Sequence, residues 1–301
     1  MNPPVVLTIA GSDSGGGAGI QADLKTFAAM GAYGTSAITA ITAQNTRGVT
    51  AIHPVPVDVV AAQLDAVLDD FEVAAVKVGM IGERAVAELI RERVAQLGRG
   101  RVAELGPGRV AQFGRGRVAE LGPGRVAELG EGRVAERGRG RGARVVNLVV
   151  DPVLVATSGA RLGAAASVGP LVAYESSILT PNRAEAAALS GSPVETAEDM
   201  VSAAVRLADG GARAVVVTGS ELATDVLWHD GVTTTLRGEP VETINNHGSG
   251  CTFSSALAVR LAFGDSVPAA VAAAKKYVTT ALRGGRDWRL GAGPGPLNHF
   301  A

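Results

Sequence analysis

The sequence of 301 residues contains a single cysteine, Cys251, and aromatic residues make up only 4% of it. One cysteine cannot form a disulfide within the chain, which favours a reducing compartment. Because aromatic rings are so few, the 47% of hydrophobic residues must build a largely aliphatic core. Uninterrupted aliphatic strands are typical of parallel sheets that are buried on both faces.

The sequence also lacks the features of a membrane or secreted protein. No apolar run reaches the roughly 20 residues that a bilayer-spanning helix needs. The opening MNPPVVLTIAG has no basic region before its apolar part. The formal net charge of −1 gives the whole protein no attraction for nucleic acid. We therefore expect a cytoplasmic protein without a membrane or nucleic-acid partner.

That net charge hides an uneven distribution. Residues 98–144 hold eleven arginines and five glutamates in degenerate octapeptides such as GRGRVAEL and GPGRVAEL, so this segment carries +6 and the remainder −7. A helix through these units would lose about 1 kcal/mol per glycine and about 3 kcal/mol per interior proline. We interpret 98–144 as a disordered low-complexity Gly/Arg insertion. An arginine-rich arm that binds RNA or acidic membrane, and a small stacked β-repeat, are the alternatives.

Elsewhere, apolar segments that resemble strands alternate with patterns that have helical spacing. Strands are expected at 5–11, 36–44, 73–81, 144–154, 176–181 and 212–220, and helices at about 20–30, 58–68, 83–97 and 198–209 and from 251 and 266. The stretch DVLWHDGVTTTLRGE predicts a hairpin that turns at Asp230-Gly231. The alternation predicts a single α/β domain over 1–301, with a mostly parallel central sheet, helices on both faces and ligands at the carboxyl ends of the strands.

Two common phosphate-binding motifs are missing. There is no GxxxxGK[ST], and GxGxxG fits poorly because Ile20 stands where its last glycine is required. The stretch AGSDSGGGAGIQADLKTF, residues 10–27, instead follows a strand and leads into a helix, so its backbone can approach a ligand closely. Asp23, in the first turns of that helix, is a candidate to bind a polar ligand group. Acidic residues also favour helix starts for electrostatic reasons alone.

Polar side chains follow other expected strands. Gln44 offers a donor and an acceptor that suit the edge of an amino-substituted heterocycle, although strand ends are often polar in any case. Asp151 follows a later strand, and Asn182 and Glu185 in PNRAE lie one helical turn apart. These oxygens suit magnesium in a phosphoryl-transfer site. A plain capping box would explain Asn182 and Glu185 equally well.

The single cysteine lies in NNHGSGCTFSSALA, residues 245–258, where a helix is expected to begin. The backbone amides of Gly248, Ser249, Gly250 and Cys251 would form an anion-binding turn with the helix dipole behind it. Such donors would stabilise the charge on a phosphoryl group during its transfer. Cys251 itself fits either a small buried hydrophobe or a thiol whose pKa the helix terminus lowers.

Taken in this order, the motifs resemble the ribokinase-like superfamily, and more closely the hydroxymethylpyrimidine/phosphomethylpyrimidine kinases of thiamine biosynthesis. The resemblance covers the chain except 98–144 and rests on AGSDSGGGAGIQADLKTF, TAQNT, VKVGM, DPVLVATSG, LTPNRAEA, HGSGCTFSSALA and GPLNHF. It implies a ribokinase-like three-layer sandwich. It also implies a homodimeric kinase that uses ATP and Mg2+ to phosphorylate 4-amino-5-hydroxymethyl-2-methylpyrimidine and then its monophosphate. A pyridoxine/pyridoxal-type kinase and a non-catalytic pyrimidine-binding protein are the alternatives.

The same resemblance implies roles for individual residues. Substrate-binding residues would be Gln44, Gly11, Asp23, Met80 and Val153, metal-organising residues Asp151, Glu185 and Asn182, and ATP-binding residues Thr218, Gly219 and Lys275. The catalytic set would be the anion-binding turn together with Asp23. Relatives such as ribokinase have an aspartate as general base where this chain has Cys251, so the thiol would need a lowered pKa or help from Asp23. The chain departs from the family at TGSELATD, where members commonly have Lys-Gly-Gly-His.

Overall fold

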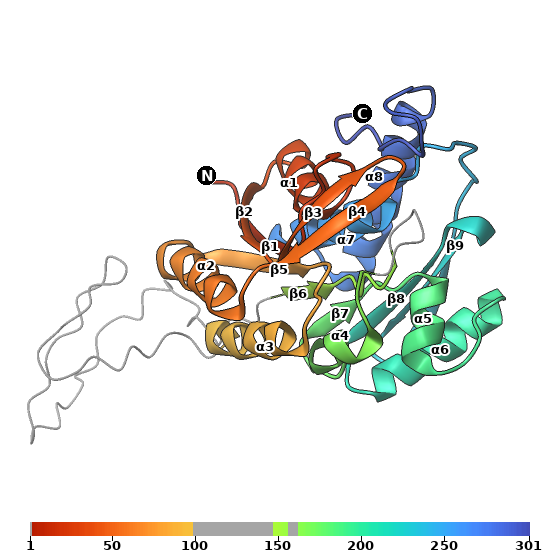
Figure 1. Ribbon diagram of the computed structural model, residues 1–301. Coiled ribbons are helices and arrows are strands. Elements are labelled where there is room, and N and C mark those ends of the chain that lie inside the picture. Colours follow the sequence, from red (N-terminus) through yellow and green to blue (C-terminus); the bar gives the residue numbers. More distant parts are fainter. Residues whose placement is uncertain (1, 99–146, 156–161) are drawn as a thin grey trace, which may run out of the picture.

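The computed structural model describes residues 2–98, 147–155 and 162–301, and its framework is an eight-stranded sheet (Figure 1). The strand order is β10-β9-β8-β7-β6-β5-β1-β2. The strands are β1 (Val5–Ala10), β2 (Tyr33–Ile38), β5 (Val73–Val78), β6 (Asn147–Val150), β7 (Ser177–Leu179), β8 (Ala214–Gly219), β9 (Thr224–His229) and β10 (Val232–Arg237). Strands β2 to β8 in this order are parallel, and β9 and β10 add an antiparallel edge. The predicted mostly parallel sheet is confirmed.

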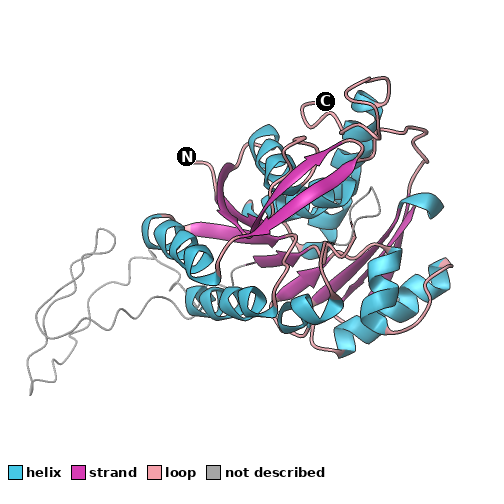
Figure 2. Ribbon diagram, in the orientation of Figure 1, coloured by secondary structure: helices cyan, strands magenta, loops and turns pink. Residues whose placement is uncertain are grey.

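Helices cover both faces of this sheet (Figure 2). One face packs against α1 (Gly19–Ala29), α7 (Ser249–Ala262) and α8 (Val267–Gly285), which bury Phe27 and Leu257. The other face packs against α2 (Val57–Asp70), α3 (Arg84–Gly98), α4 (Ala165–Val172), α5 (Arg183–Ser190) and α6 (Ala197–Asp209). The buried hydrophobic side chains of both layers are almost all aliphatic, as the low aromatic content requires. The predicted three-layer sandwich is therefore confirmed.

The segment predicted as one strand over 36–44 belongs to two sheets. It ends in the main sheet at Ile38 and continues as β3 (Ala40–Asn45), which pairs with β4 (Gly48–Pro54) in a separate two-stranded ribbon (Figure 1). Thr39 makes the break, because its amide donates to the Ala10 carbonyl at 3.0 Å and its hydroxyl donates to the Met80 carbonyl at 2.7 Å. The prediction of a single strand was wrong, since apolar alternation continues unchanged across such a bend.

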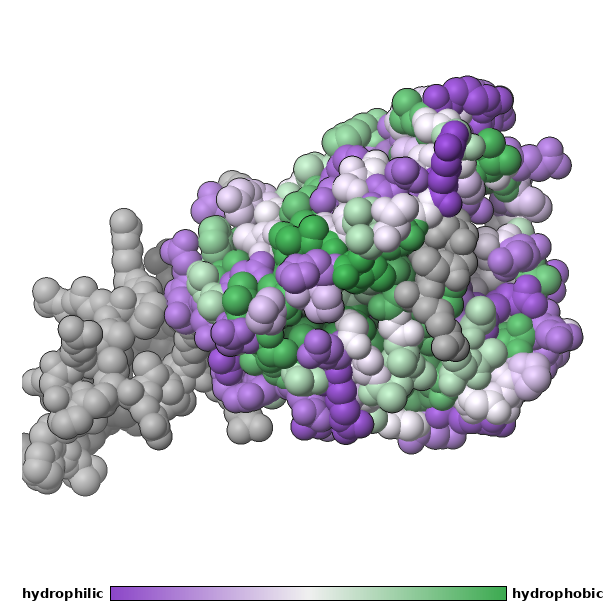
Figure 3. Space-filling model, viewed as in Figure 1, coloured by the Kyte–Doolittle hydropathy of each residue, from purple (hydrophilic) through white to green (hydrophobic). Residues whose placement is uncertain are grey.

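The surface is mixed in character. On the face shown in Figure 3, apolar surface is concentrated in the middle and polar surface surrounds it. Among the described residues, no helix is both long and apolar enough to cross a membrane. Apart from Gly98, the insertion predicted over 98–144 lies outside the described residues. Its disorder stays a prediction. Its flanks are the end of α3 and the start of β6, which places its attachment at the amino edge of the sheet.

The β9–β10 turn offers a test of local backbone strain. Asp230 and Gly231 have φ values of 50° and 78°, as the predicted two-residue hairpin requires, and no atom lies within 4 Å of a methyl group built on Gly231. We expect Gly231→Ala to lower the free energy of unfolding by about 1 kcal/mol through left-handed strain alone. Gly169→Ala, in open space within α4, is the matched control and should leave stability equal or higher. Equal urea midpoints for the two variants would contradict this account.

Candidate active site

The candidate site lies at the carboxyl edge of the sheet, where parallel strands end side by side. The strands β1, β5, β6, β7 and β8 are successive parallel partners or neighbours, so the segments that follow them share this edge. Those segments are the glycine-rich loop 11–18, Gly79–Met80, Asp151–Val153, Thr180–Asn182 and Thr218–Gly219. Seven of the residues that the sequence predicted for the site lie in these segments: Gly11, Met80, Asp151, Val153, Asn182, Thr218 and Gly219.

The anion-binding turn begins α7 in a conformation that only glycine tolerates. Gly248 is the N-cap with φ 84°, and a side chain there would collide with the carbonyl oxygen of Gly17 in the glycine-rich loop. The first-turn amides of a helix have no acceptors within that helix, and they point outward together with the positive end of its dipole. The two loops therefore approach each other at backbone distance, which leaves the amide ends of α7 beside the glycine-rich loop.

An ion pair that the sequence did not reveal fixes these two loops together. His247 Nε2 lies 2.9 Å from Asp13 Oδ2, and Asp13 also accepts hydrogen bonds from the amides of Gly15, Gly17 and Ala18. Burial opposes ionisation of Asp13, but the bond with His247 and these amides outweigh it and lower its pKa. The partners are 234 positions apart, so no local pattern could have indicated the pair.

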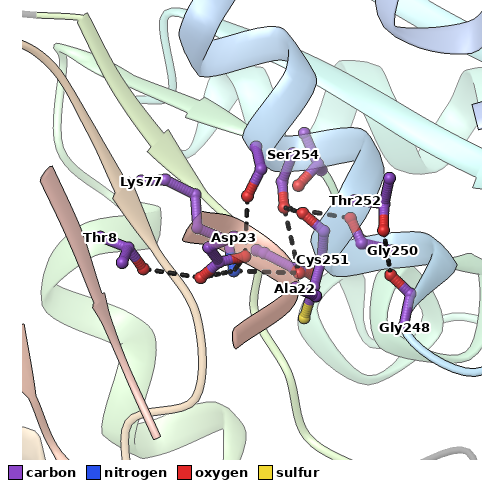
Figure 4. A network of polar contacts seen from close by, with 12 residues as sticks. Thr8, Ala22, Asp23, Lys77, Gly248, Gly250, Cys251, Thr252 and Ser254 are labelled. Carbon is purple, nitrogen blue, oxygen red and sulfur yellow. Dashed lines mark hydrogen bonds and ion pairs between the residues drawn. The ribbon is translucent and has the colours of Figure 1, made fainter. Parts of the chain in front are cut away.

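Asp23 does not contact an open cavity. Its side chain is fully buried, and its two oxygens accept hydrogen bonds from Lys77 Nζ at 2.9 and 3.0 Å, from Thr8 Oγ1 at 2.6 Å and from Ser255 Oγ at 2.7 Å (Figure 4). This arrangement contradicts the expected contact of Asp23 with the substrate, and it leaves the carboxylate without an exposed atom for proton transfer. Asp23 instead holds Lys77, whose position inside an apolar strand was the signal that the sequence analysis missed.

Asp151 and Glu185 are neighbouring buried carboxylates. Burial raises the pKa of Glu185 to about 8, and the charge of Asp151 adds to this effect. Burial also raises the pKa of Asp151, while the charge of Lys77, whose Nζ lies 3.9 Å away, opposes the rise. Asn182 and Glu185 form a complete capping box, with reciprocal side-chain bonds of 2.9 Å to the backbone. The capping-box reading of PNRAE is confirmed, and the magnesium reading stays a prediction.

These residues suit a magnesium ion that is bound together with phosphate oxygens. Among the described residues, no group of three or more His, Cys, Asp and Glu side chains could hold a metal ion unaided. Magnesium in kinases commonly has only one or two carboxylate ligands, and phosphates and water supply the rest. Asp151 and Glu185 are neighbouring carboxyl groups that supply this number of ligands, and burial raises the pKa of both. The Asn182 side-chain oxygen already accepts the Glu185 amide, so it is a weaker candidate ligand.

The pKa of the Cys251 thiol distinguishes the two alternatives that the sequence left open. Part of the residue is accessible, but burial of the thiol, together with the charges of Asp151 and Asp23, raises its pKa to about 12. Lys77 and the backbone of Gly19 act in the opposite direction without compensating. Of the two alternatives that the sequence left open, this direction favours the small buried hydrophobe over a thiol with a lowered pKa. A neutral thiol is a poor general base at physiological pH.

The predicted substrate-binding residues lie partly at the edge of the main sheet and partly on the β3–β4 ribbon. Gly11 and Met80 touch, since any side chain at Gly11 would collide with the methionine methyl group. Val153 is half-buried in the turn that follows Asp151, and its amide donates to the Asp151 carbonyl at 2.8 Å. Gln44 lies on β3, half-buried, and accepts a bond from Thr42 at 3.2 Å. A cavity of about 230 Å3 lies beside it, lined by Gln44, Asn45, Thr46, Arg47, His247, Gly293 and Pro294.

The residues predicted to bind ATP are connected by a carboxylate that the sequence did not indicate. Asp225 on β9 accepts the Gly219 amide at 3.1 Å and Lys275 Nζ at 2.7 Å. Thr218 precedes this link and donates its amide to the Pro181 carbonyl at 2.9 Å. The structure thus brings Thr218, Gly219 and Lys275 together at the end of β8. Lys275 is neutralised by Asp225, so it is held in place rather than free to extend.

The fold and this site define an α/β small-molecule kinase of the ribokinase-like type, and comparison with known proteins agrees. The chain matches the profile of the phosphomethylpyrimidine kinase family over residues 13–104 and 133–298, and it belongs to that family. It is 40% identical to hydroxymethylpyrimidine/phosphomethylpyrimidine kinase from Rhizobium meliloti, over 98% of this chain and 97% of the relative.

Solved structures give the same fold. A pyridoxal kinase from Bacillus subtilis, crystallised with ADP, is 31% identical, with a TM-score of 0.74 over 99% of this chain and 97% of the other. A phosphomethylpyrimidine kinase from Clostridium difficile is also 31% identical, with a TM-score of 0.67 over 93% of this chain and 99% of the other. Relatives named for two different substrates therefore share this architecture.

The raised pKa of Cys251 predicts slow alkylation. At pH 7.5 we expect iodoacetamide to modify the native protein at least about tenfold more slowly than the urea-unfolded chain, because the thiolate is the reacting species. Since the sequence has one cysteine, intact-mass spectrometry reads this single event directly. Faster labelling of the native state would restore the lowered pKa that the helix terminus suggested.

Proposed function

We propose that this protein phosphorylates 4-amino-5-hydroxymethyl-2-methylpyrimidine with ATP and then phosphorylates the resulting monophosphate to the diphosphate. The observation that carries the proposal is the position of Asp151 beside the first turns of α7. Ser254 Oγ of that helix donates to Asp151 Oδ2 at 3.2 Å, and the same oxygen lies 4.0 Å from a methyl group built on Gly250. Asp151, a carboxylate suited to a cation, thus lies next to the anion-binding turn of α7.

In the first reaction, the substrate hydroxyl oxygen forms a bond to the γ-phosphorus as the bond to the β–γ bridging oxygen breaks and ADP leaves. The hydroxyl proton passes to water or to an oxygen of the transferred phosphoryl group as the new bond forms. Magnesium, when bound, neutralises charge on the phosphate oxygens. The amides of the anion-binding turn stabilise the charge on the transferred group. Cys251, neutral and close to this turn, is not needed as a base because such transition states are loose and develop little charge on the nucleophile. In the second reaction the attacking phosphate oxygen is already anionic.

The pyrimidine ring would be recognised by the β3–β4 ribbon and by the contact between Gly11 and Met80. The Gln44 side chain can donate to a ring nitrogen and accept from an exocyclic amino group. Thr218 and Gly219 would then lie by the nucleotide, with Lys275 behind them. We further propose a cytoplasmic homodimer, as for an enzyme of soluble metabolites, and analytical ultracentrifugation would test the dimer.

The substrate assignment is tested by steady-state assay with the pyrimidine, its monophosphate and pyridoxal, with products identified by phosphorus NMR. We expect kcat/KM to be higher for the pyrimidine. A higher value for pyridoxal would favour the second candidate, which the likeness to the Bacillus subtilis pyridoxal kinase supports. The absence of ATP-dependent turnover of any of the three would leave a binding protein as the better description.

The role of Gln44 gives a sharper prediction. Gln44→Ala should raise KM for the pyrimidine about tenfold or more, because the ring edge would lose both of its hydrogen-bond partners. Gln96→Ala, an exposed residue on α3, is the matched control and should behave as the unsubstituted protein. An unchanged KM in Gln44→Ala would show that Gln44 on the β3–β4 ribbon does not contribute to substrate binding.

The insertion should be dispensable for catalysis. The family match omits residues 105–132, and the flanking α3 and β6 attach the segment at the edge of the sheet opposite the site. We therefore expect deletion of 105–132 to change kcat/KM by less than about threefold, as is usual for insertions away from the site. A loss of activity with unchanged thermal stability would instead connect this segment with the reaction.

A further inference from the structure

Lys77 is a charged residue in the middle of the apolar strand β5, and its side chain is fully buried. Lysine is almost never fully buried unless it is paired, because the loss of hydration costs several kcal/mol. An aliphatic residue at this position would satisfy the needs of a parallel strand. The presence of the ammonium group in the sheet therefore needs a reason beyond folding.

The ammonium group is enclosed by groups from three parts of the chain. It bonds to both oxygens of Asp23 on α1, at 2.9 and 3.0 Å, and lies 3.9 Å from Asp151 Oδ2 after β6. Space for it depends on Gly79, where a methyl group would lie 2.9 Å from Lys77 Nζ. Lys77 thus joins the buried Asp23 to the carboxylate at the edge of the sheet.

The helix that carries the anion-binding turn closes the same network. Ser254 and Ser255 are consecutive residues of α7, and their hydroxyls donate to two different carboxylates. Ser254 bonds to Asp151 at 3.2 Å and Ser255 bonds to Asp23 at 2.7 Å. Because Lys77 lies between these carboxylates, α7 is held at two points against one buried cation.

We propose that Lys77 is a positioning residue for phosphoryl transfer: through Asp23 and Ser255 it fixes the anion-binding turn of α7 relative to Asp151. This inference rests on the proposed kinase function. The proposed role does not involve the groups that would contact the pyrimidine ring, since Lys77 contacts neither Gln44 nor the rest of the β3–β4 ribbon. Loss of the lysine should therefore reduce the rate of transfer while leaving binding of the pyrimidine largely intact.

The test compares Lys77→Met, Ser255→Ala and the double variant Asp23→Asn/Lys77→Met with the unsubstituted protein. We expect kcat to fall about 100-fold in Lys77→Met, a loss typical of groups displaced by about 1 Å, with KM for the pyrimidine changed less than about threefold. Ser255→Ala, which removes one hydroxyl, should lower kcat by about fivefold. Lys276→Met, an exposed lysine on α8, is the matched control.

The double variant separates positioning from stability. It removes both charges, so its urea stability should recover relative to Lys77→Met, while its kcat should remain low. Recovery of kcat together with stability would show that the pair is merely structural and would overturn the proposal. If neither lysine variant folds, Ser255→Ala decides, and a kcat equal to that of the unsubstituted protein would likewise overturn it.

The baseline distinguishes this proposal from the proposed substrate. All variants are measured with whichever of the pyrimidine and pyridoxal the unsubstituted protein turns over better. A preference for pyridoxal would therefore refute only the substrate assignment, whereas an unchanged kcat in Lys77→Met would refute only the role of Lys77. Absence of turnover with both substrates would overturn both proposals.

Discussion

The arrangement of the site depends on one buried cation shared by two carboxylates. Lys77 is enclosed with Asp23 and Asp151 where solvent cannot screen their charges, so loss of the lysine would leave buried carboxylates without a counter-charge. The hydroxyls of Thr8, Ser254 and Ser255 satisfy the remaining carboxylate positions. These bonds join β1, α1, β5, the end of β6 and α7. The elements on either side of the sheet edge are thereby held in one relative position.

Beyond this network, the site carries more negative charge than its lysine can neutralise. Asp23 takes both short bonds of the ammonium group, and Asp151 receives only a longer contact. Glu185, a further step away, has a pKa raised to about 8. The carboxyl groups thus lie progressively farther from the lysine toward the open side of the edge, where the proposed function would place a magnesium–phosphate complex. The fixed amides of the anion-binding turn lie next to this region. Groups suited to a cation and groups suited to an anion therefore lie side by side.

Local patterns were enough to predict the layers, the parallel sheet, the β9–β10 turn and the edge at which polar residues meet. They could not predict contacts between distant segments. The Asp13–His247 pair joins residues 234 positions apart, and the bend at Thr39 depends on carbonyls of Ala10 and Met80. Asp23 was assigned to the substrate because its helix position was visible and its partner Lys77 was not. The sequence left the pKa of Cys251 open for the same reason, because a helix dipole is a local property and burial is not.

The division of the site between two sheets explains how relatives with one architecture can be named for two substrates. The anion-binding turn, Asp151 and Lys77 belong to the main sheet and its helices, and under the proposed function they act on phosphate and metal charge. Gln44 lies on the separate β3–β4 ribbon, whose link to the main sheet is the bend at Thr39. Side chains on that ribbon can change without displacing the buried network. Ring specificity can therefore diverge through the hairpin while the transfer chemistry stays fixed, which is consistent with the likeness of this chain to both pyrimidine and pyridoxal kinases.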